Sequence, residues 1–272
     1  MRQIVGFICG VDHLAGTLDM ADGTTGLLII SGGNEIRSGT FAGQADMARH
    51  IQALGYPVFR FDRRGVGDSE GLNTGFENSA DDIAAALSAF RASAPAIRRV
   101  VGIGNCDAAT ALLSFPHAEE FCALILSNPW TIDPAQASGS NPAINAAAIR
   151  ARYRARLKSP RSFYDLLAGR INISKLAIGI ARAITLNPSS QLAARFGKQL
   201  AVRDMPITIC LAKGDTTAIA FQAAWKSQAF RSARKKANIA LVSFNTASHS
   251  FAEPPARAWL YAQVEHVLKQ QG

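Results

Sequence analysis

One cysteine of the chain, Cys106, lies where a side chain can act as a nucleophile. It follows an apolar segment that predicts a strand, Val100–Ile103, and precedes a segment with helical spacing, Asp107–Phe115. A tight turn between the two places the sulfur at the helix N-terminus, where the helix dipole and free backbone N–H groups favour a thiolate. Gly104 and Ala108, two residues to either side, are as small as such a strained turn requires. We therefore expect Cys106 to form a covalent intermediate.

The residue after Cys106 is an acid, and its effect on the sulfur has two parts. Asp107 in the first turn suits the helix dipole, but its charge opposes a thiolate next to it. A purely structural cysteine at a strand end is the alternative interpretation of this segment.

An acid and a histidine could act together with Cys106 in catalysis. Asp215 follows the apolar segment Ile207–Leu211, and His249 follows Ile239–Phe244 in a loop of small residues. The other four histidines lie in predicted turns, helices or loops without such a setting: His13, His50, His117 and His266. A histidine that takes the proton of a thiol, oriented by a carboxylate, is the arrangement that activates a nucleophile.

The segment Gly104–Ala108 resembles the Gly-x-Ser-x-Gly nucleophile elbow of α/β-hydrolases, with cysteine in place of serine. The order nucleophile, acid, histidine is also the order of that superfamily. The resemblance implies that Asp215 is the triad acid and His249 the general base. It further implies an oxyanion hole formed by the N–H groups of Gly33 and Asp107, although Ser31 stands where that loop usually has histidine.

The chain resembles one family within this superfamily most, the exosortase A system-associated hydrolases. The resemblance lies in four motifs: Gly33–Glu35 with Ser38 and Gly39 soon after, Arg60–Ser69, Cys106–Ala109 and Asn128–Trp130. The second of these also resembles the Asp-x-Arg-Gly-x-Gly-x-Ser loop of many α/β-hydrolases, where its role is structural. The family implies a setting in bacterial exopolysaccharide production and export, without implying a substrate.

The elements that must position these residues alternate between strands and helices. The alternation predicts an α/β-hydrolase fold, a mostly parallel eight-stranded sheet with helices on both faces. The expected strands are Ile4–Cys9, Leu14–Met20, Gly26–Ser31, Pro57–Phe61, Val100–Ile103, Cys122–Leu126, Pro206–Ala212 and Ile239–Phe244. The expected helices are Gly39–Leu54, a helix from Asn78 or Ser79 to Ala92, Asp107–Phe115, Ala218–Phe230 and Pro255–Lys269.

Residues 132–203 interrupt this alternation, and we expect them to form a basic helical lid inserted into a core made of residues 1–131 and 204–272. The chain carries a net charge of +9, and Asn141–Leu200 holds eleven Lys or Arg against one acid, Asp165. A local excess of this kind concerns partners rather than fold. The expected partner is a small-molecule or lipid- or sugar-linked acyl substrate, an anionic one included, or an anionic membrane surface.

Other classes fit the sequence less well. Arg150, Arg152, Arg154 and Arg156 alternate, which spreads them around a helix and argues against nucleic-acid binding. The four cysteines match no zinc spacing, and Cys9, Cys122 and Cys210 lie in apolar segments where burial is expected. We expect neither a metal nor an organic cofactor.

No apolar segment has the length of a membrane span and the N-terminus predicts a strand, so a cytoplasmic protein is expected, with peripheral contact at the inner membrane face.

The sequence leaves two functions open. One is an ester or thioester hydrolase, or an acyltransferase, that works through Cys106, His249 and Asp215. The other is a non-catalytic adaptor or binding protein of the polysaccharide machinery, which the exchange of serine for cysteine and the missing histidine at Ser31 would permit. The complete nucleophile–acid–histidine order favours the enzyme.

Overall fold

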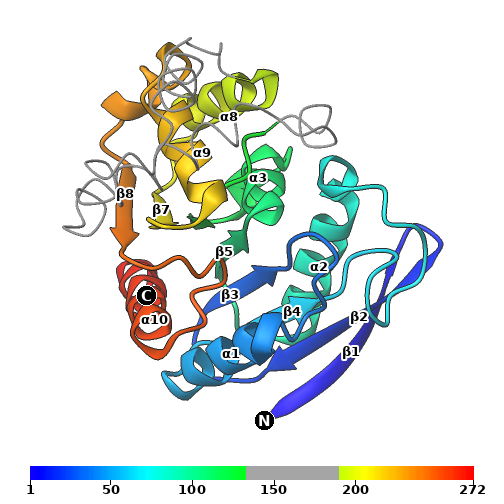
Figure 1. Cartoon of the computed structure of the whole chain (residues 1–272). Coiled ribbons are helices and arrows are strands. Elements are labelled where there is room, and N and C mark those ends of the chain that lie inside the picture. The colour runs from blue at the N-terminus through cyan, green and yellow to red at the C-terminus, as the bar shows by residue number, and fades with distance from the viewer. Residues whose placement is uncertain (133–189) are drawn as a thin grey trace, which may run out of the picture.

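The computed structural model describes residues 1–132 and 190–272 and shows a twisted eight-stranded sheet (Figure 1). The strand order is β1-β2-β4-β3-β5-β6-β7-β8. The strands are β1 (Arg2–Cys9), β2 (Asp12–Asp19), β3 (Thr25–Ile30), β4 (Val58–Phe61), β5 (Arg99–Asn105), β6 (Ala123–Ser127), β7 (Ile207–Ala212) and β8 (Ile239–Phe244). β1 and β2 form an antiparallel hairpin, β2 runs antiparallel to β4, and all other pairs are parallel. The predicted fold class is confirmed.

Helices cover both faces of the sheet. One face packs against α1 (Gly43–Ala53) and α10 (Pro254–Gln271). The other packs against α2 (Ala80–Ser93), α3 (Asp107–Ser114), α8 (Gln191–Val202) and α9 (Thr216–Trp225). Within β3, Leu27 and Ile29 face the first layer while Leu28 and Ile30 face the second, as the alternation of side chains along a strand requires. Every residue of β3 is buried, which is typical of a central parallel strand.

Two helix predictions need correction. The helix expected from Gly39 begins at Gly43, because Phe41 and Ala42 have positive φ angles of 53° and 57° and form a separate 3₁₀ turn. The helix expected over Ala218–Phe230 is α9, which starts earlier because the Asp215 carboxylate caps it, and ends at Trp225 before a second 3₁₀ turn. In both cases local turn geometry divides a segment whose apolar spacing is continuous.

The final part of the predicted lid insertion is described and packs on the core. In α8, Leu192, Ala193, Phe196 and Leu200 are buried, and the last three join the layer that contains α2 and α3. Ser190 caps this helix by accepting from the N–H of Ala193 at 2.9 Å. The remainder of the predicted lid, residues 133–189, lies outside the described residues.

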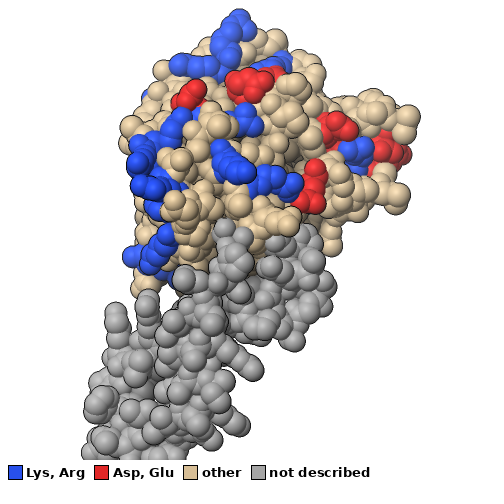
Figure 2. All heavy atoms as spheres, turned by 90° about the horizontal axis from the view of Figure 1, so that it is seen from above, with Lys and Arg blue, Asp and Glu red and all other residues tan. Residues whose placement is uncertain are grey.

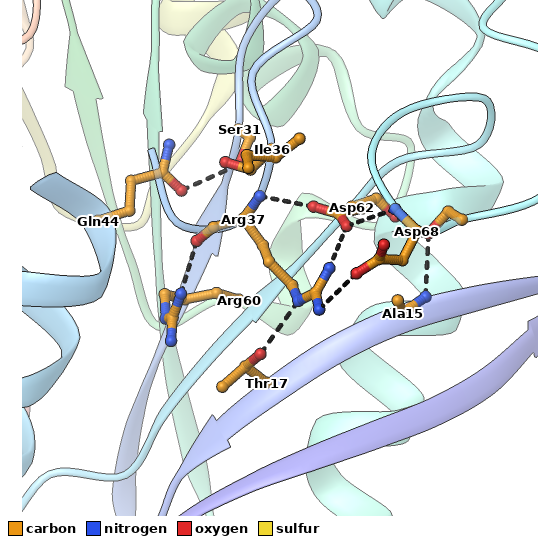
Figure 3. A network of polar contacts seen from close by, with 10 residues as sticks. Ala15, Thr17, Ser31, Ile36, Arg37, Gln44, Arg60, Asp62 and Asp68 are labelled. Carbon is orange, nitrogen blue, oxygen red and sulfur yellow. Dashed lines mark hydrogen bonds and ion pairs between the residues drawn. The ribbon is translucent and has the colours of Figure 1, made fainter. Parts of the chain in front are cut away.

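The loop after β4 is held by buried charges (Figure 3). Asp62 is fully buried and accepts hydrogen bonds from the Arg37 backbone and side chain and from the N–H of Asp68. Gly67 has a φ of 57°, and a Cβ added there would lie 2.3 Å from the Asp62 carboxylate, so only glycine fits. This loop carries Arg63 toward the segment that follows β3, where its Nη2 donates to the Gly33 carbonyl at 2.5 Å.

Candidate active site

Cys106 sits on a strained turn between β5 and α3. Its backbone angles are φ 61° and ψ −124°, a region that residues other than glycine rarely occupy. Gly104 must be small, because a Cβ there would lie 2.7 Å from the backbone carbon of Ala108 in the first turn of α3. The elbow predicted from the small residues around Cys106 is therefore the geometry that the chain adopts.

The segment after β6 anchors this elbow on both sides. The Cys106 N–H donates to the Ser127 carbonyl at 2.9 Å, and the Trp130 N–H donates to the Cys106 carbonyl at 3.1 Å. Thr110 of α3 also donates to the Trp130 carbonyl at 2.6 Å. These contacts fix the peptide groups that carry the nucleophile, which is how a strained turn persists.

Asn128 is a site residue to which sequence reasoning gave no role. It is fully buried with a positive φ of 41°. Its Nδ2 donates to the carbonyl of His249 at 2.8 Å, and its Oδ1 accepts from the N–H of Ala212 at 2.9 Å. One side chain thereby ties the end of β6 to the end of β7 and to the histidine loop. An asparagine that directly follows an apolar strand was the available signal, since buried amides must find partners.

Asp215 and His249 meet above the ends of β7 and β8. His249 Nδ1 lies 3.1 Å from Asp215 Oδ2, and the carboxylate is almost completely buried. The same Asp215 oxygen accepts from the N–H of Ala218 at 3.0 Å, so the acid also caps α9. This second bond holds the carboxylate in place independently of the histidine.

The hydrogen bond to Asp215, followed by one to Cys106, raises the pKa of His249 from 6.5 to about 10 against the opposing effect of burial. The structure thus brings all three predicted residues together, with the imidazole between carboxylate and sulfur. A protonated imidazole beside the sulfur stabilises a thiolate by charge and can later donate its proton to a leaving group.

The loop after β3, which carries the predicted oxyanion donor Gly33, lies close to the turn at Cys106. A Cβ on Gly32 would lie 2.7 Å from the Asn105 carbonyl oxygen and 2.7 Å from Asp107 Oδ1, so the loop needs glycine there. The N–H of Gly33 is beside the elbow as predicted, but it donates to Asp107 Oδ1 at 2.7 Å. The N–H of Asp107 begins α3, where backbone donors have no acceptor within the helix. Of the two predicted donors, the N–H of Gly33 holds a carboxylate, and the N–H of Asp107 makes no hydrogen bond to a group outside α3 among residues 1–132 and 190–272.

Ser31 stands where α/β-hydrolases usually have histidine, and it takes part in a network of hydrogen bonds. Ser31 is fully buried and donates to Gln44 Oε1 at 2.9 Å, as Figure 3 shows. Gln44 in turn donates to Glu35 at 2.9 Å. This chain of contacts braces the loop from the side of α1.

The other cysteines have different surroundings from Cys106. Cys9 and Cys210 are buried as expected, and burial raises the pKa of their thiols to about 11 and about 12. Cys122 is only partly buried, a departure from the expectation, although burial still raises the pKa of its thiol. All three thiols are held in the unreactive protonated form.

An apolar cavity of about 80 Å³ lies between α1 and α10, next to the site. Its walls include Ile29, Met47 and Phe251, and it reaches Asn105 and Ser250, the neighbours in sequence of the nucleophile and the histidine. The hydroxyl of Ser127 borders it without a hydrogen-bond partner among the described residues. A small apolar group fits this cavity.

Within residues 1–132 and 190–272, no group of three His, Cys, Asp or Glu side chains could hold a metal ion. None of the helices in the same part of the chain is long and apolar enough to cross a membrane.

An elbow, an acid and a histidine after the parallel strands β5, β7 and β8 form the arrangement of an α/β-hydrolase site. The chain belongs to the alpha/beta hydrolase family, which it matches over residues 27–260. No curated protein sequence matches it.

Solved structures share the fold at low sequence identity. The Pyrococcus furiosus esterase Pf2001 superimposes with a TM-score of 0.66 and 15% identity, covering 99% of this chain and 92% of that one. The esterase RhEst1 from Rhodococcus sp. ECU1013 gives 0.60 and 16%, covering 99% of each chain. Proline iminopeptidase from Mycobacterium smegmatis gives 0.60 and 14%, covering 98% of each.

Proposed function

We propose that this chain is a cysteine-dependent hydrolase or acyltransferase that acts on an ester or thioester. One observation carries the proposal: His249 lies between the Asp215 carboxylate at 3.1 Å and the Cys106 sulfur, with its pKa raised to about 10. An imidazole held in this way serves a nucleophile on one side and keeps its orientation from the other.

The reaction proceeds in two balanced halves. The Cys106 thiolate attacks the carbonyl carbon of the substrate, and the negative charge moves to the carbonyl oxygen near the N–H of Asp107. His249 donates its proton to the leaving alcohol or thiol, which leaves an acyl thioester on Cys106. Water, or a sugar hydroxyl in the transferase variant, then loses its proton to neutral His249 and attacks the thioester. The acyl product leaves and the thiolate–imidazolium pair is restored.

Further observations concern the class of substrate and the biological setting. The esterase relatives in the fold favour an ester, and the apolar cavity beside Asn105 favours a small apolar acyl group. The resemblance of four motifs to those of exosortase A system-associated hydrolases favours a role in bacterial exopolysaccharide production. In one of these motifs, Trp130 holds the elbow and Asn128 holds the His249 loop.

Intact-protein mass spectrometry tests the proposal. The protein is incubated with a panel of acyl esters and thioesters of increasing chain length, quenched in acid and weighed. We expect a mass increase of one acyl group that maps to Cys106 and disappears in Cys106→Ala. Cys106→Ser should retain little turnover, because a hydroxyl is much harder to deprotonate.

A second function has one observation in its favour. The Asp107 carboxylate occupies the N–H of Gly33, which is where a substrate oxyanion would bind. A non-catalytic adaptor would tolerate this contact. Absence of any acyl adduct across the panel, with Cys106 still open to alkylation, would support the adaptor and reject the enzyme.

A further inference from the structure

Asp107 belongs to the predicted oxyanion hole and also fills it. Asp107 offers its N–H as one donor, while its own carboxylate accepts from the other donor, the N–H of Gly33, at 2.7 Å. A substrate oxyanion in the same place would meet a negative charge, so acyl transfer requires this carboxylate to leave.

Arg63 lies next to the Asp107 carboxylate. Its side chain is buried, its Nη2 donates to the Gly33 carbonyl at 2.5 Å, and the same Nη2 is 3.8 Å from Asp107 Oδ2. Its Nη1 is buried without a hydrogen-bond partner among the described residues. A buried charged donor left unpaired is costly, so this nitrogen favours any arrangement that brings it an acceptor.

We propose that the Asp107 side chain closes the oxyanion hole of the free protein and that Arg63 receives it when an acyl group binds. This inference rests on the proposed function. Rotation about the two side-chain torsions of Asp107 carries Oδ1 away from Gly33 and toward Arg63 without moving the backbone. The hydrogen bond gained at Arg63 offsets the one lost at Gly33. Arg63 keeps its bond to the Gly33 carbonyl, so the loop stays in place while its N–H becomes free.

The closing of the hole therefore slows acylation of Cys106 and not its alkylation, whereas the reactivity of the sulfur affects both rates. Alkylation by iodoacetamide forms a carbon–sulfur bond and expels iodide, with no charge on a carbonyl oxygen. Acylation by a p-nitrophenyl ester forms an oxyanion and needs both N–H donors. The ratio of the two rate constants at Cys106 isolates the state of the oxyanion hole from the reactivity of the sulfur.

Variants of Asp107 give the first test. Asp107→Ala empties the hole, and we expect the acylation-to-alkylation ratio to rise about tenfold, the order expected for one charged hydrogen bond. Asp107→Asn keeps an oxygen that accepts from Gly33 but offers no charge to Arg63. Its ratio should stay at or below that of the unmodified protein. A ratio for Asp107→Ala that is unchanged or lower overturns the proposal, as does a rise in Asp107→Asn equal to that of Asp107→Ala.

Variants of Arg63 give the second test. Arg63→Met removes the alternative place for the carboxylate, so the ratio should fall about tenfold. Arg63→Met also removes the bond to the Gly33 carbonyl, so the two variants are combined: Asp107→Ala should raise the ratio by a larger factor in Arg63→Met than in the unmodified protein. A purely structural role of Arg63 would give the same factor in both backgrounds and would contradict the proposal. Circular dichroism checks folding, and if Arg63→Met does not fold, the Asp107 pair decides alone.

The proposed function fails in a different way. If neither the unmodified protein nor Asp107→Ala forms an acyl adduct while iodoacetamide still labels Cys106, the chain is no acyl-transfer enzyme. If acyl adducts form but the Asp107 variants do not alter the ratio as stated, the enzyme stands and only the closing of the hole is rejected.

Discussion

At the scale of single residues, the environment of Cys106 differs from that of the other three thiols. Cys106 is partly exposed beside His249, whereas burial raises the pKa of the thiols of Cys9, Cys122 and Cys210. Only the thiolate reacts readily with alkylating reagents. A substoichiometric amount of iodoacetamide at neutral pH should therefore modify Cys106 first, as read by peptide mapping. Equal labelling of all four, or earlier labelling of Cys122, would contradict the assignment.

Replacing the other two members of the triad should lower turnover by different amounts. His249→Ala removes the proton acceptor and should reduce kcat on the order of 10³-fold or more. Asp215→Asn should cost less, because this residue orients the imidazole without transferring a proton.

Two substitutions of Asp215 separate its role in turnover from its role as the cap of α9. Asparagine also caps helices, so Asp215→Asn should keep the stability of α9, while Asp215→Ala should lose about 1 kcal/mol of unfolding free energy. Turnover of His249→Ala near that of the unmodified protein would reject the triad.

The raised pKa of His249 predicts a pH dependence of stability. The folded protein keeps this proton up to about pH 10, whereas the unfolded chain loses it near the ordinary value of 6.5. Between these values the folded state binds more protons, so stability must fall as pH rises. Urea unfolding at several pH values should show a flatter profile for His249→Gln than for the unmodified protein. Parallel profiles would show that this histidine is not held protonated.

At the scale of elements, the candidate site depends on one side chain that joins the ends of β6 and β7 and the His249 loop. Asn128 holds the ends of β6 and β7 and the His249 loop together through two short hydrogen bonds. Asn128→Ala leaves the buried N–H of Ala212 and the partly buried carbonyl of His249 without this partner, which should cost about 1–3 kcal/mol of unfolding free energy and lower kcat by displacing His249. The exposed Asn73, which bonds Asn34, provides a matched control. Asn73→Ala should change neither quantity, and equal behaviour of the two variants would refute this role.

At the scale of the whole molecule, positive charge dominates two segments. The first is Asn141–Leu200, most of which lies outside the described residues. The second lies on the described chain, where Lys226, Arg231, Arg234 and Lys235 are exposed with no acid among them. Figure 2 shows Lys and Arg side chains gathered along one side of the face seen from above, with fewer acids between them. Such a surface attracts anionic partners over distances of about one Debye length.

We expect this charge to bind the protein to anionic membranes reversibly. Each cation near such a surface contributes about 1 kcal/mol, so a few suffice for binding that salt abolishes. Sedimentation with anionic vesicles should pull down the protein at low salt, and neutral vesicles should not. Arg231→Glu with Arg234→Glu, compared with Arg152→Glu with Arg154→Glu, shows which segment is responsible. Negligible binding to both vesicle types, with a salt-independent kcat/KM, would leave only solvated charges.

The sequence by itself determined most of the elements and predicted the three residues of the proposed triad. Apolar periodicity reports the local backbone state, so the eight strands followed from it, while the turn at Cys106 was implied by the resemblance of Gly104–Ala108 to the nucleophile elbow. Because parallel strands end at one edge of the sheet, Cys106, Asp215 and His249 could be expected to converge. The helix ends near Phe41 and Trp225 could not be predicted in this way, because caps and turns there end the helix although the apolar spacing continues.

Only the tertiary structure decided which groups the triad's neighbours contact. The Gly33 N–H and the Asp107 carboxylate are 74 residues apart in sequence, and Asn128 and His249 are 121 apart. Such contacts depend on how loops from different strands pack and on which side-chain torsions that packing allows, and no local pattern records either. The sequence therefore supplied the predicted nucleophile, acid and histidine, while packing placed the Asp107 carboxylate on the Gly33 N–H and a buried arginine next to it.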